Sequence, residues 1–327
     1  MEGMNDEDIT QELEIERYSN QVMRIPRYIG NFLVTKNLME TNSCVVVLAS
    51  DPEVDEKIAI KCIPISETAI IAWDHEVQVM NSLDHPNIIK CLNYFQFPSD
   101  EPRFCTIVMP LAIYDLYTYV EKKMPLSEIK ICRIFYDVIN AVISMHRRSC
   151  WHRDIKLENI LIIDETTPLP YAVVSDFGLS AYMPGEAVRG IGTGTLEYAA
   201  PELVETVYSE SEHAFVRQFK QEAEYTNKID SWCLGIALNQ ILFRTCAPFD
   251  LQGNIFFPPP PPTCPNISNE ARDLIIQLTR YNPNERISIT DAAEHQWFKN
   301  FGIYGTPPPR INNRYIQSFD LPSAEID

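Results

Sequence analysis

Two short polar motifs in the middle of the chain bring together residue types that can do chemistry. HRDIKLEN at residues 152–159 places an aspartate, a lysine and an asparagine close together, and SDFG at residues 175–178 adds a second aspartate. Far upstream, KIAIK at residues 57–61 ends on another lysine. Carboxylates and lysines in this combination suggest nucleotide chemistry, in which cationic groups balance phosphate charge.

The first part of the chain is predicted to supply strands and one helix. β-Branched residues dominate 28–49 and 57–64, and FCTIVMPLA at 104–112 is typical of a buried strand. Between them, residues 69–83 place Ile70, Trp73, Val77 and Met80 at helical spacing. We therefore expect a small sheet with one helix.

After Leu126 the pattern becomes helical. Residues 127–149 predict a long amphipathic helix with Ser127 as N-cap. Its expected buried face consists of Ile131, Ile134, Phe135, Val138 and Val142. Residues 227–243 and 268–281 predict further helices, whereas FFPPPPPTCP at 256–265 indicates a stiff polyproline connector.

The order of the motifs is more specific than any one of them. HRDIKLEN and SDFG are followed by YAAPE at 198–202 and DSWCLG at 230–235. In this order the chain resembles the eukaryotic protein kinase family over residues 27–303.

The resemblance implies an α+β bilobal kinase fold. It implies a β-rich N-lobe with one main helix at 27–109, a hinge at 110–114 and a mostly α-helical C-lobe at 115–303. An acidic N-terminal tail, 1–26, and a C-terminal tail, 304–327, flank this kinase domain.

The resemblance also implies roles for the residues of the two central motifs. Asp154 would orient the substrate hydroxyl and accept its proton, and Lys156 would reach the transferred phosphate. Asn159 and Asp176 would supply oxygen ligands to Mg²⁺, a hard cation. Both ATP and Mg²⁺ are thus expected.

ATP would be held by residues from both lobes. Lys61 corresponds to the lysine on the α- and β-phosphates, and Glu76 to its ion-pair partner. The other implied ATP-binding positions are the apolar walls Val46, Ala59 and Leu161, the gatekeeper Met109 and the hinge residue Ala112.

Several further matches imply structural support. Glu202 and Arg286 correspond to a buried pair that joins the activation segment to the C-lobe. Asp230 corresponds to a residue that binds the backbone of the catalytic loop. Trp297 and Phe298 are expected in the core.

Specificity for serine and threonine follows by resemblance from two positions. In DIKLEN, Lys156 stands two residues after the catalytic aspartate. Thr195 stands where such kinases use a threonine to bridge Asp154 and Lys156. YIGNFLVTKNL, DFGLS and YAAPE are most similar to the calcium/calmodulin-dependent and AMP-activated kinase group. Glu158 indicates protein substrates with basic residues near the acceptor. The C-terminal tail has no basic amphipathic helix, so calmodulin binding there is unsupported.

The phosphate-facing loop departs from the family. In NLMETNSCVVVLAS at 37–50, Met39, Thr41 and Cys44 occupy the three glycine positions. Glycine lets backbone N–H groups approach phosphates without a Cβ in the way, so its loss predicts weaker nucleotide binding. We expect a slower enzyme. The alternative is a pseudokinase, a nucleotide-binding or scaffold protein with little turnover.

The activation segment, DFGLSAYMPGEAVRGIGTGTLEYAAPE at 176–202, departs as well. Ile191 stands where relatives carry an activating phosphothreonine, so Arg153 lacks the phosphate that it would bind. Two hypotheses follow: Thr193 is a shifted phosphorylation site, or the segment is ordered without phosphate through apolar contacts of Ile191. An insertion at 203–229 is longer than the usual link and rich in acidic residues. It is expected to be a surface loop, or alternatively a partner-docking element.

Composition narrows the partners. The 45 acidic against 27 basic residues give a formal net charge of −18, which argues against binding nucleic acid or an anionic membrane through a basic surface. Nine cysteines stand singly, as in proteins of a reducing compartment. No apolar run approaches a membrane span, and the N-terminus does not resemble a signal peptide. We expect a cytoplasmic or nuclear ATP-dependent protein serine/threonine kinase.

Overall fold

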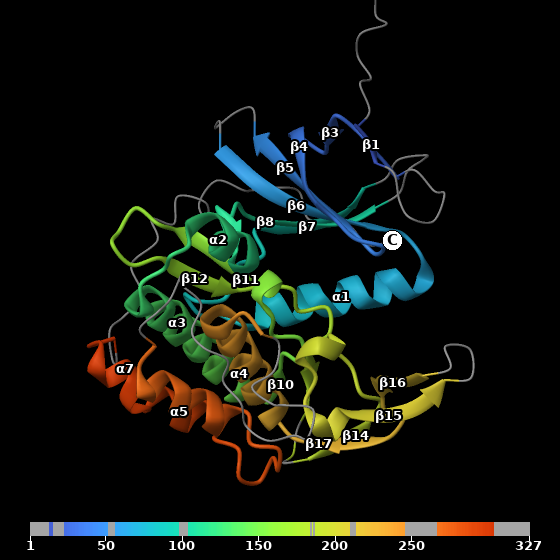
Figure 1. Cartoon of the computed structure of the whole chain (residues 1–327). Helices are drawn as coiled ribbons and strands as arrows, with labels where there is room; N and C mark the ends of the chain where they lie inside the picture. Colours follow the sequence, from blue (N-terminus) through green and yellow to red (C-terminus); the bar gives the residue numbers. More distant parts are fainter. Residues whose placement is uncertain are drawn as a thin grey trace, which may run out of the picture. The chain divides into compact units, whose positions relative to one another are not determined.

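The computed structural model describes residues 13–15, 23–51, 56–97, 104–183, 185, 187–209, 214–245 and 267–303. The described residues divide into two compact units, one containing those within 1–82 and 89–111 and the other those within 83–88 and 112–303. The first unit is rich in strands and the second in helices (Figure 1), which confirms the predicted fold class. The lobe boundaries stay predictions, and the polyproline connector lies outside the described residues.

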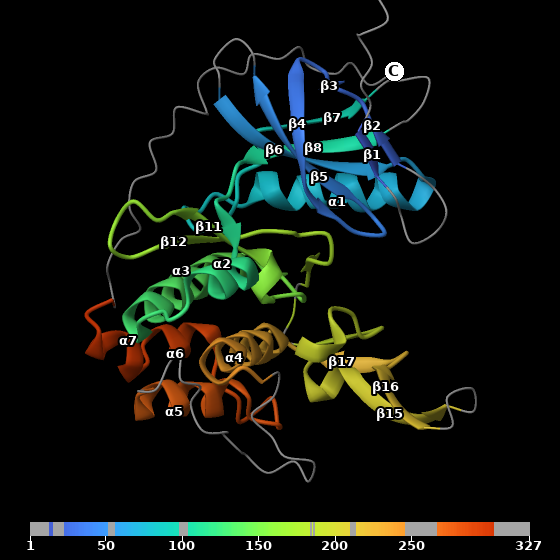
Figure 2. The same cartoon turned by 45° about the horizontal axis from the view of Figure 1, so that its top comes forward.

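The first unit is built on an antiparallel sheet with the strand order β3-β4-β5-β6-β8-β7. Its strands are β3 (Tyr28–Ile29), β4 (Phe32–Glu40), β5 (Val45–Asp51), β6 (Glu56–Pro64), β7 (Asn93–Phe97) and β8 (Phe104–Pro110). A separate pair consists of β1 (Leu13–Ile15) and β2 (Met23–Ile25). One helix, α1 (Glu67–Ser82), lies along the sheet in Figure 2.

The two faces of this sheet carry different sets of side chains because successive strand residues point to opposite sides. On β5, Val45, Val47 and Ala49 are fully buried in a core cluster shared with β6 and β8. Val46 points to the other face, where its cross-strand partner is Lys61. The alternation therefore fixes which residues remain for a ligand.

Helix α1 follows the predicted spacing. Trp73, Val77 and Met80 are buried, and the Trp73 indole N–H donates to the Thr106 carbonyl at 3.0 Å. Glu76 lies among these apolar residues and is itself buried. A carboxylate in such a place needs a cationic partner.

The second unit contains six helices among its described residues. They are α2 (Leu116–Lys123), α3 (Glu128–His146), α4 (Lys228–Phe243), α5 (Asn269–Leu278), α6 (Ile289–Ala293) and α7 (Gln296–Asn300). Short 3₁₀ turns are η2 (Leu157–Asn159), η3 (Leu196–Tyr198) and η4 (Pro201–Leu203). Its strands are β9 (Tyr114–Asp115), β10 (Cys150–Trp151), β11 (Ile160–Asp164), β12 (Tyr171–Val174), β13 (Ala181–Tyr182), β14 (Val188–Gly190), β15 (Val204–Ser209), β16 (Ala214–Phe219) and β17 (Ala223–Tyr225).

Helix α3 confirms the amphipathic prediction. All five residues of its expected inner face are fully buried, and Ser127 is the N-cap residue, although its side chain makes no capping hydrogen bond. Trp297 and Phe298 of α7 are also fully buried, as expected of core residues.

The expected surface loop after Glu202 is wrong. Instead, β15 and β16 pair as antiparallel strands of a β-hairpin, with six paired positions from Val204↔Phe219 to Ser209↔Ala214. Figure 2 shows β15 and β16 side by side, next to β17. The acidic composition of the insertion suggested a loop, but VETVYS and AFVRQF are rich in the β-branched and aromatic residues that favour strands.

Glu202 and Arg286 form the predicted ion pair. Arg286 Nη1 lies 2.7 Å from Glu202 Oε1, and Nη2 lies 2.9 Å from Oε2. The buried guanidinium also donates to the carbonyls of Arg280 and Lys228 and lies over the Trp232 ring. This bidentate geometry ties η4 to α4 and to the turn before α6.

Asp230, in the first turn of α4, binds the backbone before β11 as predicted. Its Oδ1 accepts the Arg153 N–H at 2.8 Å, and its Oδ2 accepts the His152 N–H at 3.0 Å. His146 Nε2 lies 2.7 Å from the same Oδ2. Burial acts to raise the pKa of Asp230, but the hydrogen bond and charge of His146 and the other donors outweigh it and hold the pKa below its ordinary value.

We expect Asp230→Asn to lower the free energy of unfolding by on the order of 3 kcal/mol at neutral pH, because an amide donor would face buried donors. A depressed carboxyl pKa contributes stability above the unfolded-state pKa of about 3.9, and this stability is lost as the pH falls through the folded-state value. The difference between wild type and variant should therefore stay constant down to about pH 5 and shrink only below about pH 4.

Denaturant unfolding across that pH range checks this expectation, with Asp74→Asn on the exposed side of α1 as the control. A difference that already narrows near neutral pH would mean that the pKa of Asp230 is raised.

Candidate active site

The carboxylate of Asp154 is buried and held from three directions. Thr195 Oγ1 donates to its Oδ1 at 2.7 Å. Its Oδ2 lies 2.9 Å from Lys156 Nζ and accepts Asn159 Nδ2 at 3.2 Å. With both oxygens engaged, the carboxylate has one orientation, which suits a group that must align a substrate.

Thr195 bridges Asp154 and Lys156 as the sequence predicts. Its hydroxyl accepts Lys156 Nζ at 3.0 Å while it donates to Asp154. Gly194 brings Thr195 this close, because a Cβ on Gly194 would lie 2.7 Å from the Arg153 carbonyl and the residue has a φ of +120°. Glycine is needed at this approach.

Asn159 links the two central motifs. Its Nδ2 donates to the Asp154 carbonyl at 2.8 Å, and its own carbonyl accepts the Ser175 N–H at 2.9 Å. Beside it, His152 Nδ1 accepts the Asp154 N–H, so Nε2 carries the proton that it donates to the Ser175 carbonyl. The residue before Asp176 is thus fixed against the HRDIKLEN stretch at 152–159.

Asp176 adopts a left-handed backbone conformation, with a φ of +63°, and is exposed. The next residue, Phe177, is fully buried and packs against His152 with ring centroids 5.4 Å apart. Burial of Phe177 therefore offsets a conformation that costs a non-glycine residue roughly 1 kcal/mol. The two side chains proposed for a cation, Asn159 and Asp176, are both oxygen donors, which suits Mg²⁺.

No cluster of three or more histidine, cysteine, aspartate or glutamate side chains suited to a metal occurs in the part of the chain that the structure describes. Asn159 and Asp176 alone would leave several coordination positions to other oxygens. That is the usual situation for Mg²⁺ bound together with phosphates.

In the first unit, Lys61 and Glu76 form the predicted ion pair. Lys61 Nζ lies 2.7 Å from Glu76 Oε1 and 2.8 Å from Oε2. The lysine side chain is 12% exposed and the glutamate 5%, so water screens the pair little. The pairing holds the ammonium at a fixed place on the sheet.

The predicted adenine-wall residues of the first unit share the sheet face of Lys61. Val46 is the cross-strand partner of Lys61, and Met109 is the partner of Ala59. Alternate residues of paired strands point to the same side, so these four side chains line one surface. Ala112 and Leu161 belong to the second unit, where Leu161 on β11 pairs with Asp115 of β9.

The glycine-free loop is a tight turn organised by Thr41. Its Oγ1 accepts the N–H groups of Ser43 and Cys44, and its own N–H donates to the Cys44 carbonyl at 2.9 Å. Met39 before the turn is 47% exposed, whereas Cys44 is buried. The side-chain hydroxyl of Thr41 thus orders this turn, whereas glycines at the same positions would have no side chain to do so.

The hypothesis that apolar contacts of Ile191 order the activation segment is wrong. Ile191 is 59% exposed, so apolar contacts of this residue do not order the segment. Instead, β14 pairs with β17 through Val188↔Tyr225, Arg189↔Glu224 and Gly190↔Ala223. The sequence analysis missed Tyr225, which is buried and lies beside Arg153, because its partners are distant in the chain.

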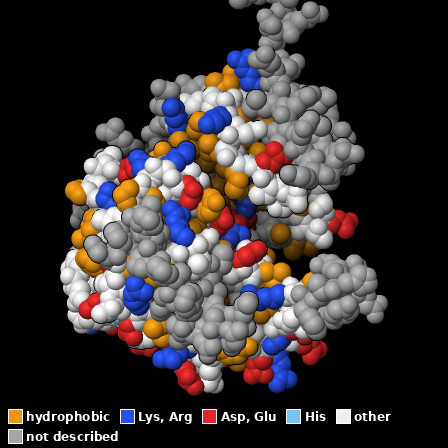
Figure 3. Space-filling view, in the orientation of Figure 1, with side chains coloured by type: hydrophobic (Ala, Val, Ile, Leu, Met, Phe, Trp, Pro, Cys, Tyr) orange, Lys and Arg blue, Asp and Glu red, His pale blue; other side chains and the backbone are white. Residues whose placement is uncertain are grey.

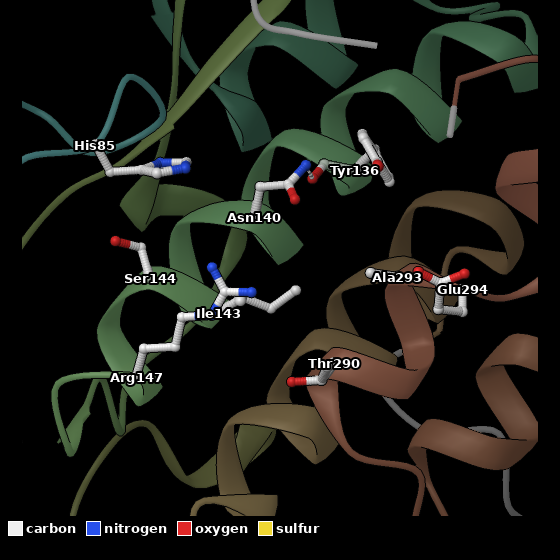
Figure 4. Close-up of a pocket in the computed structure, with 9 residues that line it drawn as sticks. All are labelled: His85, Tyr136, Asn140, Ile143, Ser144, Arg147, Thr290, Ala293 and Glu294. Atoms are coloured by element: carbon white, nitrogen blue, oxygen red, sulfur yellow. Dashed lines mark hydrogen bonds between the residues drawn. The ribbon is translucent and has the colours of Figure 1, made fainter. Parts of the chain in front are cut away.

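A separate cavity of about 310 Å³ lies in the second unit between α3 and α6. Figure 4 shows Asn140 from α3 and Arg147 just after its end on one side, Thr290 from α6 on the other, and His85 nearby. None of the candidate catalytic residues lines it. We therefore do not assign the cavity to the active site.

Charges are mixed on the face drawn in Figure 3, where lysine and arginine side chains alternate with aspartate and glutamate among the described residues. No described helix combines the length and the apolar character that crossing a bilayer requires.

Comparisons with known proteins agree with this arrangement. A family model described as protein kinase domain matches residues 34–298. Aurora kinase of Saccharomyces cerevisiae is 30% identical over 236 residues, which are 68% of this chain and 55% of the yeast protein. The SNF1-related protein kinase catalytic subunit alpha KIN12 of Arabidopsis thaliana is 28% identical over 304 residues, covering 90% of this chain and 56% of its own.

The meiosis-specific serine/threonine-protein kinase mek1 of Schizosaccharomyces pombe is 28% identical over 228 residues, 69% of this chain and 49% of its own. The chain spans about half the length of these curated relatives. The SNF1-related kinase fits the group that the motifs indicated. Because the family model covers most of the chain, the chain belongs to the protein kinase domain family.

Proposed function

We propose that this protein is an ATP-dependent serine/threonine kinase that transfers the γ-phosphate of ATP to hydroxyl groups of protein substrates. The observation that carries the proposal is the arrangement of Asp154, Lys156 and Thr195. Thr195 contacts both other side chains at 2.7 and 3.0 Å, and Asp154 and Lys156 lie 2.9 Å apart.

In the proposed reaction, a carboxylate oxygen of Asp154 accepts the hydrogen bond of the substrate hydroxyl and orients its oxygen toward the γ-phosphorus. The new oxygen–phosphorus bond forms as the bond to the β–γ bridging oxygen breaks, and the electron pair leaves with ADP. The hydroxyl proton passes to Asp154. Lys156, held by Thr195, balances negative charge on the phosphoryl oxygens.

The residues that we propose for nucleotide binding are those that the resemblance to the family implies. Lys61, fixed by Glu76, would contact the α- and β-phosphates, and the apolar side chains Val46, Ala59 and Leu161 would contact the adenine. Asn159 and Asp176 would hold Mg²⁺, which when bound neutralises charge on the β- and γ-phosphates.

Specificity for serine and threonine is supported by Thr195 and by the printed name of the Schizosaccharomyces pombe relative. Lys61, Asp154 and Asp176 are all present, so no observation favours the pseudokinase alternative. The exposed Glu158 supports substrates with a basic residue near the acceptor, and the seven described cysteines, all free, support a reducing, intracellular location.

We expect Asp154→Ala to reduce phosphate transfer roughly 100-fold or more, because the hydroxyl loses its proton acceptor. The measurement is incorporation of radiolabelled phosphate from ATP into two serine peptides, one with an arginine and one with a glutamate upstream of the serine. The wild type should favour the arginine peptide.

Asp74→Ala, which removes an exposed carboxylate of α1, is the control. Equal incorporation by the wild type and Asp154→Ala would refute the proposed function. Indifference to arginine would refute only the basic preference.

The turn at Thr41 leads to a second prediction, which concerns the KM for ATP. The variant Met39→Gly/Thr41→Gly/Cys44→Gly should lower the KM for ATP by roughly fivefold, which corresponds to about one added backbone–phosphate hydrogen bond. Steady-state kinetics at saturating peptide measure this KM. Leu38→Gly, at an exposed neighbouring position, serves as the control, and an unchanged KM in the triple variant would show that this loop does not limit ATP binding.

A further inference from the structure

The segment between Asp176 and Thr195 is held in the second unit by backbone pairing. β14 and β17 are antiparallel neighbours over three residue pairs. An ion pair between Arg189 and Glu224 accompanies them, but both side chains are largely exposed, so this contact contributes little. The backbone hydrogen bonds themselves keep residues 188–190 in place.

A second contact lies at Gly192. Its N–H donates to the Lys220 carbonyl at 3.0 Å, and the Lys220 N–H donates to the Leu203 carbonyl at 2.9 Å. A Cβ on Gly192 would lie 2.5 Å from that Leu203 oxygen and 2.9 Å from the Phe219 ring. The base of the β15–β16 hairpin thus closes directly over residue 192 and leaves room only for glycine.

Tyr225 connects this support to the catalytic loop. The residue is 4% exposed, and its ring packs edge-on against Trp151, with centroids 6.1 Å apart. Its hydroxyl lies 3.5 Å from Arg153 Nη1 and 3.5 Å from the position that a Cβ of Gly190 would take. The Tyr225 side chain therefore contacts Trp151 and Arg153 and lies beside Gly190, the last residue of β14.

Arg153 is already positioned by protein groups. Its Nε donates to the Leu179 carbonyl at 2.6 Å, and Nη1 reaches the Tyr225 hydroxyl. The hydroxyl of Thr195 is engaged with Asp154 and Lys156, which leaves Thr193 as the other hydroxyl residue of the stretch from 188 to 195. Two nitrogens of the Arg153 guanidinium therefore already contact protein groups.

We propose that Tyr225 is a positioning residue and that, with β17 and the hairpin base, it sets the 188–195 segment against the catalytic loop without phosphorylation. The inference rests on the proposed kinase function. Tyr225 acts through Arg153 and the backbone of β14, so its loss should slow the transfer step and leave ATP binding alone.

The test uses full-length protein treated with phosphatase and shown to be phosphate-free by intact mass. Wild type should keep its kcat after this treatment. Tyr225→Phe should lose roughly fivefold in kcat, the effect of about one hydrogen bond, with the KM for ATP unchanged. Tyr28→Phe, on the exposed end of β3, is the matched control and should keep both constants.

Gly192→Ala is a second variant, in which the added Cβ would displace the segment from the hairpin and lower kcat further. If phosphatase treatment abolishes wild-type transfer and rephosphorylation of Thr193 restores it, the inference is overturned. A Tyr225→Phe enzyme with wild-type kcat also overturns it.

Hydrogen exchange separates this inference from the function on which it rests. The amides of residues 188–190 should exchange faster in Tyr225→Phe than in wild type. If this occurs while no form of the protein transfers phosphate, the positioning role stands and the proposed function fails. Unchanged exchange overturns the positioning role.

Discussion

The buried carboxylate of Asp230 is the constraint on which the candidate active site depends. It accepts the backbone N–H groups of His152 and Arg153, the two residues before Asp154. Arg153 has a φ of +68°, which is unfavourable for a residue with a Cβ. Hydrogen bonds to a buried charged group are strong enough to offset that cost, so the bend that turns Asp154 toward Thr195 persists.

A second set of contacts brings distant segments to the same place. Gly194 passes close to the Arg153 carbonyl and delivers Thr195 to Asp154. Asn159 and His152 hold the stretch that ends in Asp176, because both form hydrogen bonds with the backbone of Ser175. These links combine backbone–backbone, side chain–backbone and side chain–side chain contacts at short range, which explains how residues from three parts of the chain hold one geometry.

Sequence patterns predicted most of the regular elements, because those signals are local. The helical spacing of α1 and α3 follows from which side chains must be buried, and the polar motifs keep fixed spacings. The β15–β16 hairpin was not predicted because the acidic residues of the insertion are typical of a solvated loop. Its two strand segments nevertheless contain the β-branched and aromatic residues that favour strands. Tyr225 was missed for another reason: its role depends on Arg153 and Trp151, which only the fold brings near.

The proposed function requires Thr195 to hold Asp154 and Lys156 in place for phosphate transfer. Thr195→Val keeps the shape of the side chain and removes the hydroxyl, whereas Thr195→Ser keeps the hydroxyl. Measured kcat at saturating ATP and peptide should fall roughly 100-fold for Thr195→Val and remain close to wild type for Thr195→Ser. A Thr195→Val enzyme as fast as wild type would contradict the account.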